Sequence, residues 1–373
     1  MRDQCLLQIF FFENEKVKMN RLIKNIHLVF FLLCFSLLNA QETKRFSVYL
    51  IGDAGENTQP GAALLELKKQ IESDPQSAVV FLGDNVYPAG LKKKDPNTIL
   101  RINAQLNMLK DYKGAAYIIP GNHDWAAQTI KGKAVLLEQQ NYVDSVCKTF
   151  SISNNNSGSF FPKNALPGPE AVLIAPGVRL VMIDTQWFLH AFKKNKSGSK
   201  KQTEKTFYFR LDSILLYAKQ NNEQVIVAGH HPIYTNGEHS RKMQPLRFMI
   251  NYVPPFQLFG AAGLYRLFSQ DIDHHQYKKM RKELLAIFRK YDKVVYVCGH
   301  DHNMQLFVQE NDTYIVSGAG SKLSKLRKKK RFESMWNDDS STGFIRLDIL
   351  ENGSLNMRVF KTTEPKVLDL KGF

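Results

Sequence analysis

The hydrophobic positions along the chain follow two different periods. Short runs rich in β-branched and aromatic residues predict strands at 45–51, 78–82, 115–119, 172–174, 179–183, 224–228, 293–297 and 314–317. Apolar residues spaced three and four apart predict helices at 61–72, 97–109, 211–220 and 277–291. Two more alternating runs, 343–350 and 354–360, flank Asn352-Gly353 and predict an antiparallel hairpin. Because strands alternate with helices, we expect an α/β sandwich.

Five of the predicted strands end in a glycine that is followed by chemically active side chains. The five motifs are Gly52-Asp53-Ala54-Gly55, Gly83-Asp84-Asn85-Val86-Tyr87, Gly121-Asn122-His123-Asp124, Gly229-His230-His231-Pro232 and Gly299-His300-Asp301-His302-Asn303. Ligands of α/β sheets gather beyond the carboxyl ends of the strands, where each of these motifs is placed. Side chains two residues apart on an extended backbone point the same way, so His300 and His302 can reach into one site.

The side chains of these motifs are typical of a metal site. The candidates are Asp53, Asp84, Tyr87, Asn122, His123, His230, His300 and His302. Hard oxygen donors with imidazoles, and no pair of thiolates, suit iron, manganese or zinc and argue against a cysteine-based structural zinc site. They are too many for one ion, whereas two ions about 3.5–4 Å apart and bridged by one carboxylate would use nearly all of them.

The order of the motifs resembles the calcineurin-like metallophosphoesterases, and within them the purple acid phosphatases of the small tartrate-resistant type. A tyrosine three residues after the second aspartate, here Tyr87 after Asp84, separates purple acid phosphatases from the wider superfamily. The resemblance covers about residues 46–360, apart from insertions. It implies a four-layer αββα sandwich with mixed β-sheets.

The resemblance also implies a role for each ligand. Asp53, Tyr87 and His302 would bind Fe(3+), Asn122, His230 and His300 would bind Fe(2+), Zn(2+) or Mn(2+), and Asp84 would bridge. A phenolate is a hard anionic donor, which independently suits ferric iron. A metal-bound hydroxide would then attack phosphorus in line, because coordination lowers the pKa of water towards ~7.

Three further residues are candidates for catalysis. His123, next to Asn122, is placed to protonate the leaving group, and Asp124 is placed to orient it. His239 matches the second histidine of the family that is not a ligand. His231 points away from His230 along the strand, so a supporting role behind the ligands or a solvent-facing position is expected.

The charge of the chain points to anionic partners. Its 373 residues carry a formal net charge of +16, much of it in two tracts, 193–205 and 322–331. Both tracts are interpreted as solvated loops, and the alternative is a docking surface for polyanions or anionic lipid. We expect a phosphate-ester substrate, no specific nucleic acid and a monomer.

The first 40 residues are interpreted as a signal peptide. A basic start at 19–24 precedes a short apolar run at 26–38, and Ala40 precedes the expected cut. Met19 is a candidate for the true start, and an uncleaved anchor is the alternative. The protein is therefore expected to be exported, to the periplasm, the cell surface or the medium. Cys147 and Cys298 remain in the mature chain, and Cys298 is expected to be a small buried residue.

The rest of the chain, 41–373, is interpreted as one catalytic domain with a cap-like insertion at about 240–277. The segment 249–268 is rich in apolar residues, but Pro254-Pro255 and Arg266 argue against a transmembrane helix. A cap beside the site is the first interpretation, and contact with a membrane surface is the second. Ala54 stands where small members of the family usually have an aromatic residue. Its small side chain would open the pocket wall.

Three functions compete. The first is an exported acid phosphatase that hydrolyses phosphate monoesters at a dinuclear metal site. The second is a phosphodiesterase or nucleotidase that uses the same metals. The third is a non-enzymatic surface-binding protein, against which the complete set of ligand positions weighs.

Overall fold

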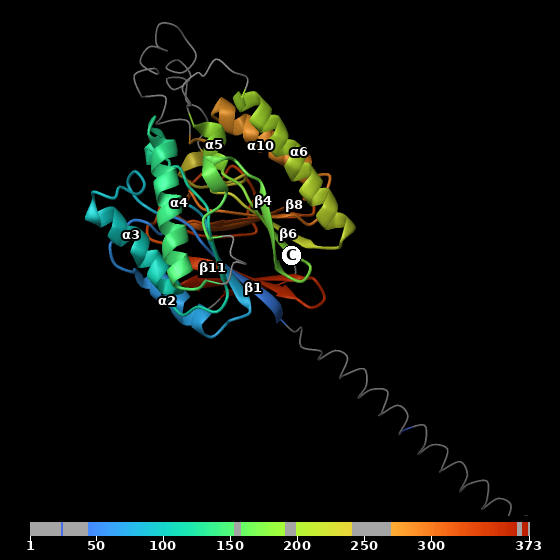
Figure 1. Ribbon diagram of the computed structural model, residues 1–373. Helices are drawn as coiled ribbons and strands as arrows, with labels where there is room; N and C mark the ends of the chain where they lie inside the picture. The colour runs from blue at the N-terminus through green and yellow to red at the C-terminus, as the bar shows by residue number, and fades with distance from the viewer. Residues whose placement is uncertain are drawn as a thin grey trace, which may run out of the picture. The chain divides into compact units, whose positions relative to one another are not determined.

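Two mixed β-sheets face one another at the centre of the unit Lys44–Phe373 (Figure 1). The computed structural model describes residue 24 and residues 44–152, 158–190, 199–240, 270–363 and 368–371. The first sheet has the order β13 (Leu368–Lys371), β12 (Leu355–Lys361), β11 (Gly343–Leu350), β1 (Lys44–Ile51), β2 (Ser77–Phe81) and β3 (Ala115–Ile118). The second has the order β10 (Trp336–Asp338), β8 (Met304–Gln309), β9 (Asp312–Ser317), β7 (Val295–Cys298), β6 (Gln224–Ala228), β5 (Val178–Met182) and β4 (Glu170–Ala175).

The strands that carry the five motifs run parallel within each sheet. In the first sheet β1, β2 and β3 are parallel, with Val48 opposite Ala78 and Val80 opposite Tyr117. In the second sheet β5, β6, β7 and β9 are parallel. Antiparallel strands complete both sheets, among them the predicted hairpin of β11 and β12. The carboxyl ends of β1, β2 and β3 therefore meet at one edge of their sheet, and those of β6 and β7 at one edge of theirs.

Alternation along each strand divides the apolar side chains between two cores. Val48 and Leu50 of β1 lie in the same buried cluster as Ile226 and Ala228 of β6, and this cluster fills the space between the sheets. The residues in between, such as Tyr49, belong to the second cluster, which also includes the buried faces of the helices. Both faces of each sheet are thus covered, as expected for a largely parallel arrangement.

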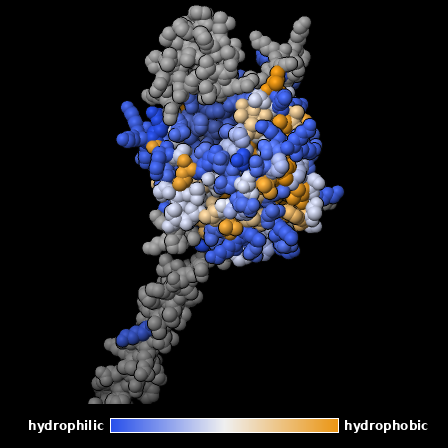
Figure 2. Space-filling model, turned by 90° about the vertical axis from the view of Figure 1, so that its left-hand side faces the viewer, coloured by the Kyte–Doolittle hydropathy of each residue, from blue (hydrophilic) through white to orange (hydrophobic). Residues whose placement is uncertain are grey.

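Helices form the two outer layers. On the side of the first sheet lie α2 (Ala62–Glu72), α3 (Pro96–Leu106) and α4 (Gly132–Thr149), and on the side of the second lie α5 (Thr185–Leu189), α6 (Ser199–Gln220) and α10 (His275–Phe288) (Figure 1). Single 3₁₀ turns lie at Asn107–Leu109, Ala126–Gln128, Lys163–Ala165 and Glu238–Ser240. The predicted αββα sandwich with mixed sheets is confirmed. The face that carries α2, α3 and α4 is mostly hydrophilic, with hydrophobic residues in separate groups (Figure 2).

Three helices differ from the predictions, and one of them is the short helix α5, which was not predicted. Helix α4 was not predicted, although Leu136, Val143 and Cys147 repeat at helical spacing along its buried side. Helix α6 begins at Ser199, so the interpretation of 193–205 as a solvated loop is wrong for its described part, 199–205. The Lys200 side chain there donates to the carbonyl oxygens of Phe188 and His190, which anchors the first turn on α5.

Two predicted segments lie outside the described residues. They are the signal peptide, apart from residue 24, and residues 241–269 of the insertion. In the part of the chain that is described, no helix combines the length and the apolar character needed to cross a membrane. Cys147 and Cys298 are both buried free thiols, as expected for Cys298.

Candidate metal centre

Every predicted ligand lies just beyond the carboxyl end of a strand. Asp53 follows β1, Asp84 follows β2, Asn122 follows β3 and His230 follows β6. His300 and His302 follow β7, and Tyr87 lies in the turn that begins at Asp84. The two sheets thus contribute donors to one site, three strands from the first sheet and two from the second.

The backbone at the ligands is held in an unusual conformation. Asp53, Asp84 and His300 have φ values of 58°, 55° and 71°, in the left-handed region that side chains other than glycine rarely adopt. Such strain is typical of functional sites that the surrounding structure fixes. The glycines of the motifs let two segments of the chain approach closely. A Cβ atom at Gly121 would lie 2.2 Å from Oδ1 of Asp84 and would collide with it.

The first set of donors is centred on the phenol of Tyr87. Its hydroxyl oxygen lies 3.0 Å from Oδ1 of Asp53, 3.1 Å from Oδ2 of Asp84 and 3.2 Å from Nε2 of His302. The phenol has one proton for these three neighbours. Four atoms that can bind a metal ion therefore converge, and they share fewer hydrogen atoms than they make contacts. This arrangement suits a cation.

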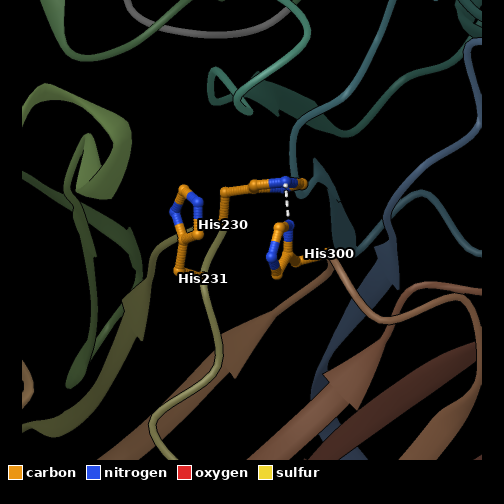
Figure 3. Close-up of side chains that lie close together, drawn as sticks. All are labelled: His230, His231 and His300. Carbon is orange, nitrogen blue, oxygen red and sulfur yellow. Dashed lines mark hydrogen bonds between the residues drawn. The ribbon is translucent and has the colours of Figure 1, made fainter. Parts of the chain in front are cut away.

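The second set is centred on the amide oxygen of Asn122. This oxygen lies 3.1 Å from Nε2 of His230 and 3.1 Å from Nδ1 of His300, and the two ring nitrogens are 3.3 Å apart (Figure 3). Oδ1 of Asp84 is 3.5 Å from Nε2 of His230. Asp84 thus faces the first set with one carboxylate oxygen and the second set with the other, as a bridging ligand must.

The second set fits a metal ion because its facing nitrogens carry lone pairs. Nδ1 of His230 donates to the Leu82 carbonyl oxygen at 2.8 Å, so in the neutral ring Nε2 carries the lone pair. Nε2 of His300 faces the Gln270 carbonyl oxygen at 3.4 Å, which leaves Nδ1 without one. With the Asn122 oxygen, three acceptors meet with no hydrogen between them, and a cation resolves this contact.

The first set needs a cation for its chemistry as well. Burial and the carboxylates of Asp53 and Asp84 raise the pKa of the Tyr87 phenol well above its usual value. Only a strong positive charge beside the oxygen would convert it to the phenolate. Burial by itself would raise the pKa of Asp84, but the neighbouring histidines, with His230 first, hold that pKa below its ordinary value when their rings are protonated and charged.

Two half-buried histidines flank the donor sets. The His123 ring lies 4.4 Å from the Tyr87 ring, and its Nδ1 is 2.6 Å from the Pro88 carbonyl oxygen. The His239 ring stacks on His300 at 4.1 Å, and its Nδ1 is 3.4 Å from Oδ1 of Asp271. Both side chains are 31% exposed, so each can meet solvent or a ligand beside the donors.

Asp124 holds the loop of His123 instead of its ring. The buried carboxylate accepts from the backbone N–H groups of Gly121, Asn85 and Val86, and from the Gln139 side chain at 2.8 Å. Burial raises the pKa of Asp124 to about 6. The expected contact between Asp124 and the His123 ring does not form, because these four donors already surround the carboxylate.

His231 is buried, so the solvent-facing interpretation is wrong. Its Nδ1 pairs with the Thr185 hydroxyl at 2.7 Å and its Nε2 with Oε1 of Gln270 at 2.6 Å. The His231 ring lies 4.5 Å from that of His300, whose Nε2 faces the backbone of the same Gln270 (Figure 3). His231 therefore supports the ligands from behind, through Gln270, which lies within the predicted insertion.

Sequence reasoning missed Gln270, Asp271 and Lys322. The first two lie within the predicted insertion and contact His231, His300 and His239, but nothing in their local sequence marks them. The Lys322 ammonium lies 3.7 Å from the centre of the Tyr87 ring. Its signal was the basic tract itself, which was interpreted as a solvated loop.

Asp184, behind the site, makes stability depend on pH. Its buried carboxylate accepts from the Trp125 indole at 2.8 Å, and burial raises its pKa to about 7. The unfolded carboxyl titrates near 3.9. Native protein therefore holds an extra proton between these values, and its stability falls as pH rises from about 4 to about 7.

We expect Asp184→Asn to remove this dependence. The free energy of unfolding of the wild type, minus that of the variant, should fall by about 1–3 kcal/mol between about pH 5 and pH 8. Urea unfolding at both pH values measures it, with Asp212→Asn on α6 as the control that should show no such trend. A difference that is constant or grows with pH would refute the assignment.

The fold and the donors define a class: α/β sandwich proteins with clustered metal-ligand side chains beyond the carboxyl ends of their strands. The chain belongs to the calcineurin-like phosphoesterase family, whose model matches residues 46–304. It is 26% identical to tartrate-resistant acid phosphatase type 5 of Rattus norvegicus over 167 residues, which cover 40% of this chain and 39% of the rat protein. The chain thus matches less than half the length of that relative.

Two other proteins are similar over most of the chain. Glideosome-associated protein 50 of Plasmodium falciparum (isolate 3D7) is 23% identical over 363 residues, which cover 90% of this chain and 78% of that protein. The crystal structure of a dimetal phosphatase from Danio rerio superposes with a TM-score of 0.53 at 13% identity, and the match covers 88% of this chain and 99% of that chain. At this identity the likeness shows the fold alone.

Proposed function

We propose that the protein is an exported acid phosphatase that hydrolyses phosphate monoesters at a dinuclear metal site. The observation that carries the proposal is the pair of donor sets that share Asp84, with two half-exposed histidines beside them. Similarity to tartrate-resistant acid phosphatase type 5 supports the choice of reaction. The substrate would bind as a phosphate dianion, because the occupied site keeps a residual positive charge.

The donors suggest which ion each set would hold. Asp53, Tyr87 and His302 would hold Fe(3+), since carboxylate and phenolate are hard anionic donors. Asn122, His230 and His300 would hold Fe(2+), Zn(2+) or Mn(2+), and Asp84 would join the two sets. When bound, such ions polarise the phosphoryl oxygens and lower the pKa of water.

The residues of the chain supply positioning and proton transfer. The His123 ring contacts Tyr87 and the His239 ring stacks on His300, so each donor set has one of these histidines beside it. Nδ1 of His239 lies 3.4 Å from Oδ1 of Asp271, and Nε2 of His123 lies 3.8 Å from Oδ2 of Asp84. Because Asp84 would join the two ions, Asp271 is the carboxylate left to hold an imidazolium, and His239 would protonate a leaving alkoxide. Asp124 would act on His123 through the loop backbone.

A panel of esters tests the reaction and the role of His239. We expect the wild type to release phosphate from 4-nitrophenyl phosphate and from an alkyl monoester such as glycerol 2-phosphate. His239→Ala should lose about 100-fold in kcat on the alkyl ester, whose leaving group needs a proton, and less than about tenfold on the nitrophenyl ester. Phosphate release at saturating substrate measures both.

The matched control is His275→Ala, an exposed histidine at the start of α10. It should change neither rate. Equal losses of His239→Ala on both esters would contradict the role as proton donor. Faster cleavage of bis(4-nitrophenyl) phosphate than of the monoester would favour the alternative, a phosphodiesterase or nucleotidase.

The export proposal depends on the N-terminal pattern alone. A basic start, an apolar run and Ala40 favour a signal peptide that is cut before Gln41. Contact with a membrane surface, through the basic tracts or the insertion, is likewise proposed from the sequence pattern. Sequencing the N-terminus of the protein recovered from its native host decides between a cleaved signal and an anchor.

One observation favours a second function. The match to glideosome-associated protein 50 extends over 90% of this chain. The solved structure of GAP50, the anchor in the inner membrane complex of Plasmodium, is also similar to this chain. A non-enzymatic binding role on a membrane would follow from that likeness. The complete donor sets favour the enzyme, and the ester panel decides between the two.

A further inference from the structure

The segment Lys322–Arg331 carries more positive charge than its neighbours neutralise. Its seven cations are Lys322, Lys325, Arg327, Lys328, Lys329, Lys330 and Arg331. Three form ion pairs: Lys322 with Glu56 at 2.5 Å, Lys325 with Asp339 at 3.4 Å and Arg331 with Asp273 at 2.8 Å. Lys328, Lys329 and Lys330 are exposed and have no ion pair within the described part of the chain.

The first half of this basic segment lies against the first set of donors. The Ser321 hydroxyl donates to the Asp53 carbonyl oxygen, and the Ser324 N–H donates to the His302 carbonyl oxygen at 2.8 Å. Between these two anchors, the Lys322 ammonium lies 3.7 Å from the centre of the Tyr87 ring. The segment therefore forms a fixed border of the site instead of a free solvated loop.

The second half lies against the loop that carries His239. The N–H groups of Arg327 and Arg331 donate to the backbone and side-chain oxygens of Asn236, at 2.9 and 2.8 Å. Both guanidinium groups donate to the Ser240 carbonyl oxygen, at 3.3 and 3.4 Å. The turn 328–330 lies between Arg327 and Arg331, which are both held on residues that flank His239. Its three lysines are exposed.

We propose that this basic segment binds a second phosphoryl group of the substrate. The preferred substrates would be small molecules with two or more phosphates, one at the donor sets and another at the turn 328–330. The inference rests on the proposed function and narrows its substrate class. Three adjacent exposed ammonium groups attract a dianion through added charge, and this attraction weakens as salt screens it.

Two sugar phosphates that share the C6 phosphate ester test the proposal. Hydrolysis of this ester yields fructose from fructose 6-phosphate and fructose 1-phosphate from fructose 1,6-bisphosphate, and only the second substrate carries another phosphate. We expect the wild type to favour the bisphosphate about tenfold in kcat/KM at low salt. The variant Lys328→Ala/Lys329→Ala/Lys330→Ala should lose this preference, and the fructose 6-phosphate rate should change less than about twofold.

A second triple variant controls for net charge. This variant changes three exposed lysines that have no ion pair among the described residues: Lys110, Lys113 and Lys219. They precede the amino ends of β3 and β6, at the sheet edges opposite those that carry the donors. Lys110→Ala/Lys113→Ala/Lys219→Ala should keep the preference. Equal effects of the two triple variants, or no preference in the wild type, would overturn the proposal.

Binding separates this proposal from the proposed function. Calorimetric titration with fructose 1,6-bisphosphate should show affinity about tenfold weaker in the 328–330 variant, whether or not any ester is cleaved. If no ester is cleaved but this loss is seen, the phosphatase proposal fails and the phosphate-binding segment stands. If the variant loses binding only to phosphatidylserine vesicles, the segment is a membrane contact and the proposal is wrong.

Discussion

Asp84→Asn is expected to lower phosphate release from 4-nitrophenyl phosphate by at least about 1000-fold. Oδ2 of Asp84 lies 3.1 Å from the Tyr87 hydroxyl, and Oδ1 lies 3.5 Å from Nε2 of His230. The variant would replace one of these oxygens by an NH₂ group, whose hydrogens repel a cation, and would remove the negative charge shared by both sets. Metal content, measured by plasma emission spectrometry, should fall from two ions per chain to one or none.

The matched control for this substitution is Asp212→Asn, on α6, where the carboxylate accepts from Lys290 and Tyr291, just beyond the end of α10. It should keep both the activity and the metal content. Far-ultraviolet circular dichroism confirms that each variant is folded. Undiminished hydrolysis by Asp84→Asn would leave the non-enzymatic function as the remaining candidate.

Tyr87→Phe is expected to remove the visible colour of the iron-loaded protein. A phenolate bound to ferric iron absorbs visible light through charge transfer, and Tyr87 is the phenol whose oxygen meets Asp53, Asp84 and His302. Without this oxygen the first set loses a donor that becomes a hard anion, the phenolate, when it binds the ion. Ferric iron should therefore also be held more weakly. The visible spectrum and the iron content of the purified variant measure the two effects.

Tyr117→Phe is the control for this variant, because its phenol is buried in the core between the sheets, away from the donors. It should leave the colour unchanged. A wild type that is active and colourless, with zinc or manganese in place of iron, would refute the ferric assignment without touching the donor geometry. A coloured Tyr87→Phe protein would show that another residue supplies the phenolate.

The sequence predicted the parts of the fold that follow from local pattern. The runs rich in β-branched and aromatic residues at 45–51 and 224–228 predicted strands, because each strand has to bury its apolar side chains against a neighbour. The glycines before Asp53, Asp84 and His300 marked where those strands end. The long helix α4 was not predicted, because its mean polarity hides the stripe formed by Leu136, Val143 and Cys147.

The order of the motifs was sufficient to name the donors, since five glycine-flanked turns in sequence are specific to one family. What the order could not give is which donors face each other. His230 and Asn122 are far apart in the sequence, yet Nε2 and Oδ1 lie 3.1 Å apart because β3 and β6 belong to two sheets packed face to face. That packing depends on the whole core.

The sequence by itself determined most of the strands and helices, the donor types and the family to which the donors point. Only the tertiary structure decided that Asp84 faces both donor sets, that Gln270 and Asp271 support His300 and His239, and that Lys322–Arg331 borders the site. The physical reason is that periodicity and turn chemistry are local properties of the chain. Contacts between distant segments instead depend on how two sheets and their loops pack, and local sequence carries no record of that.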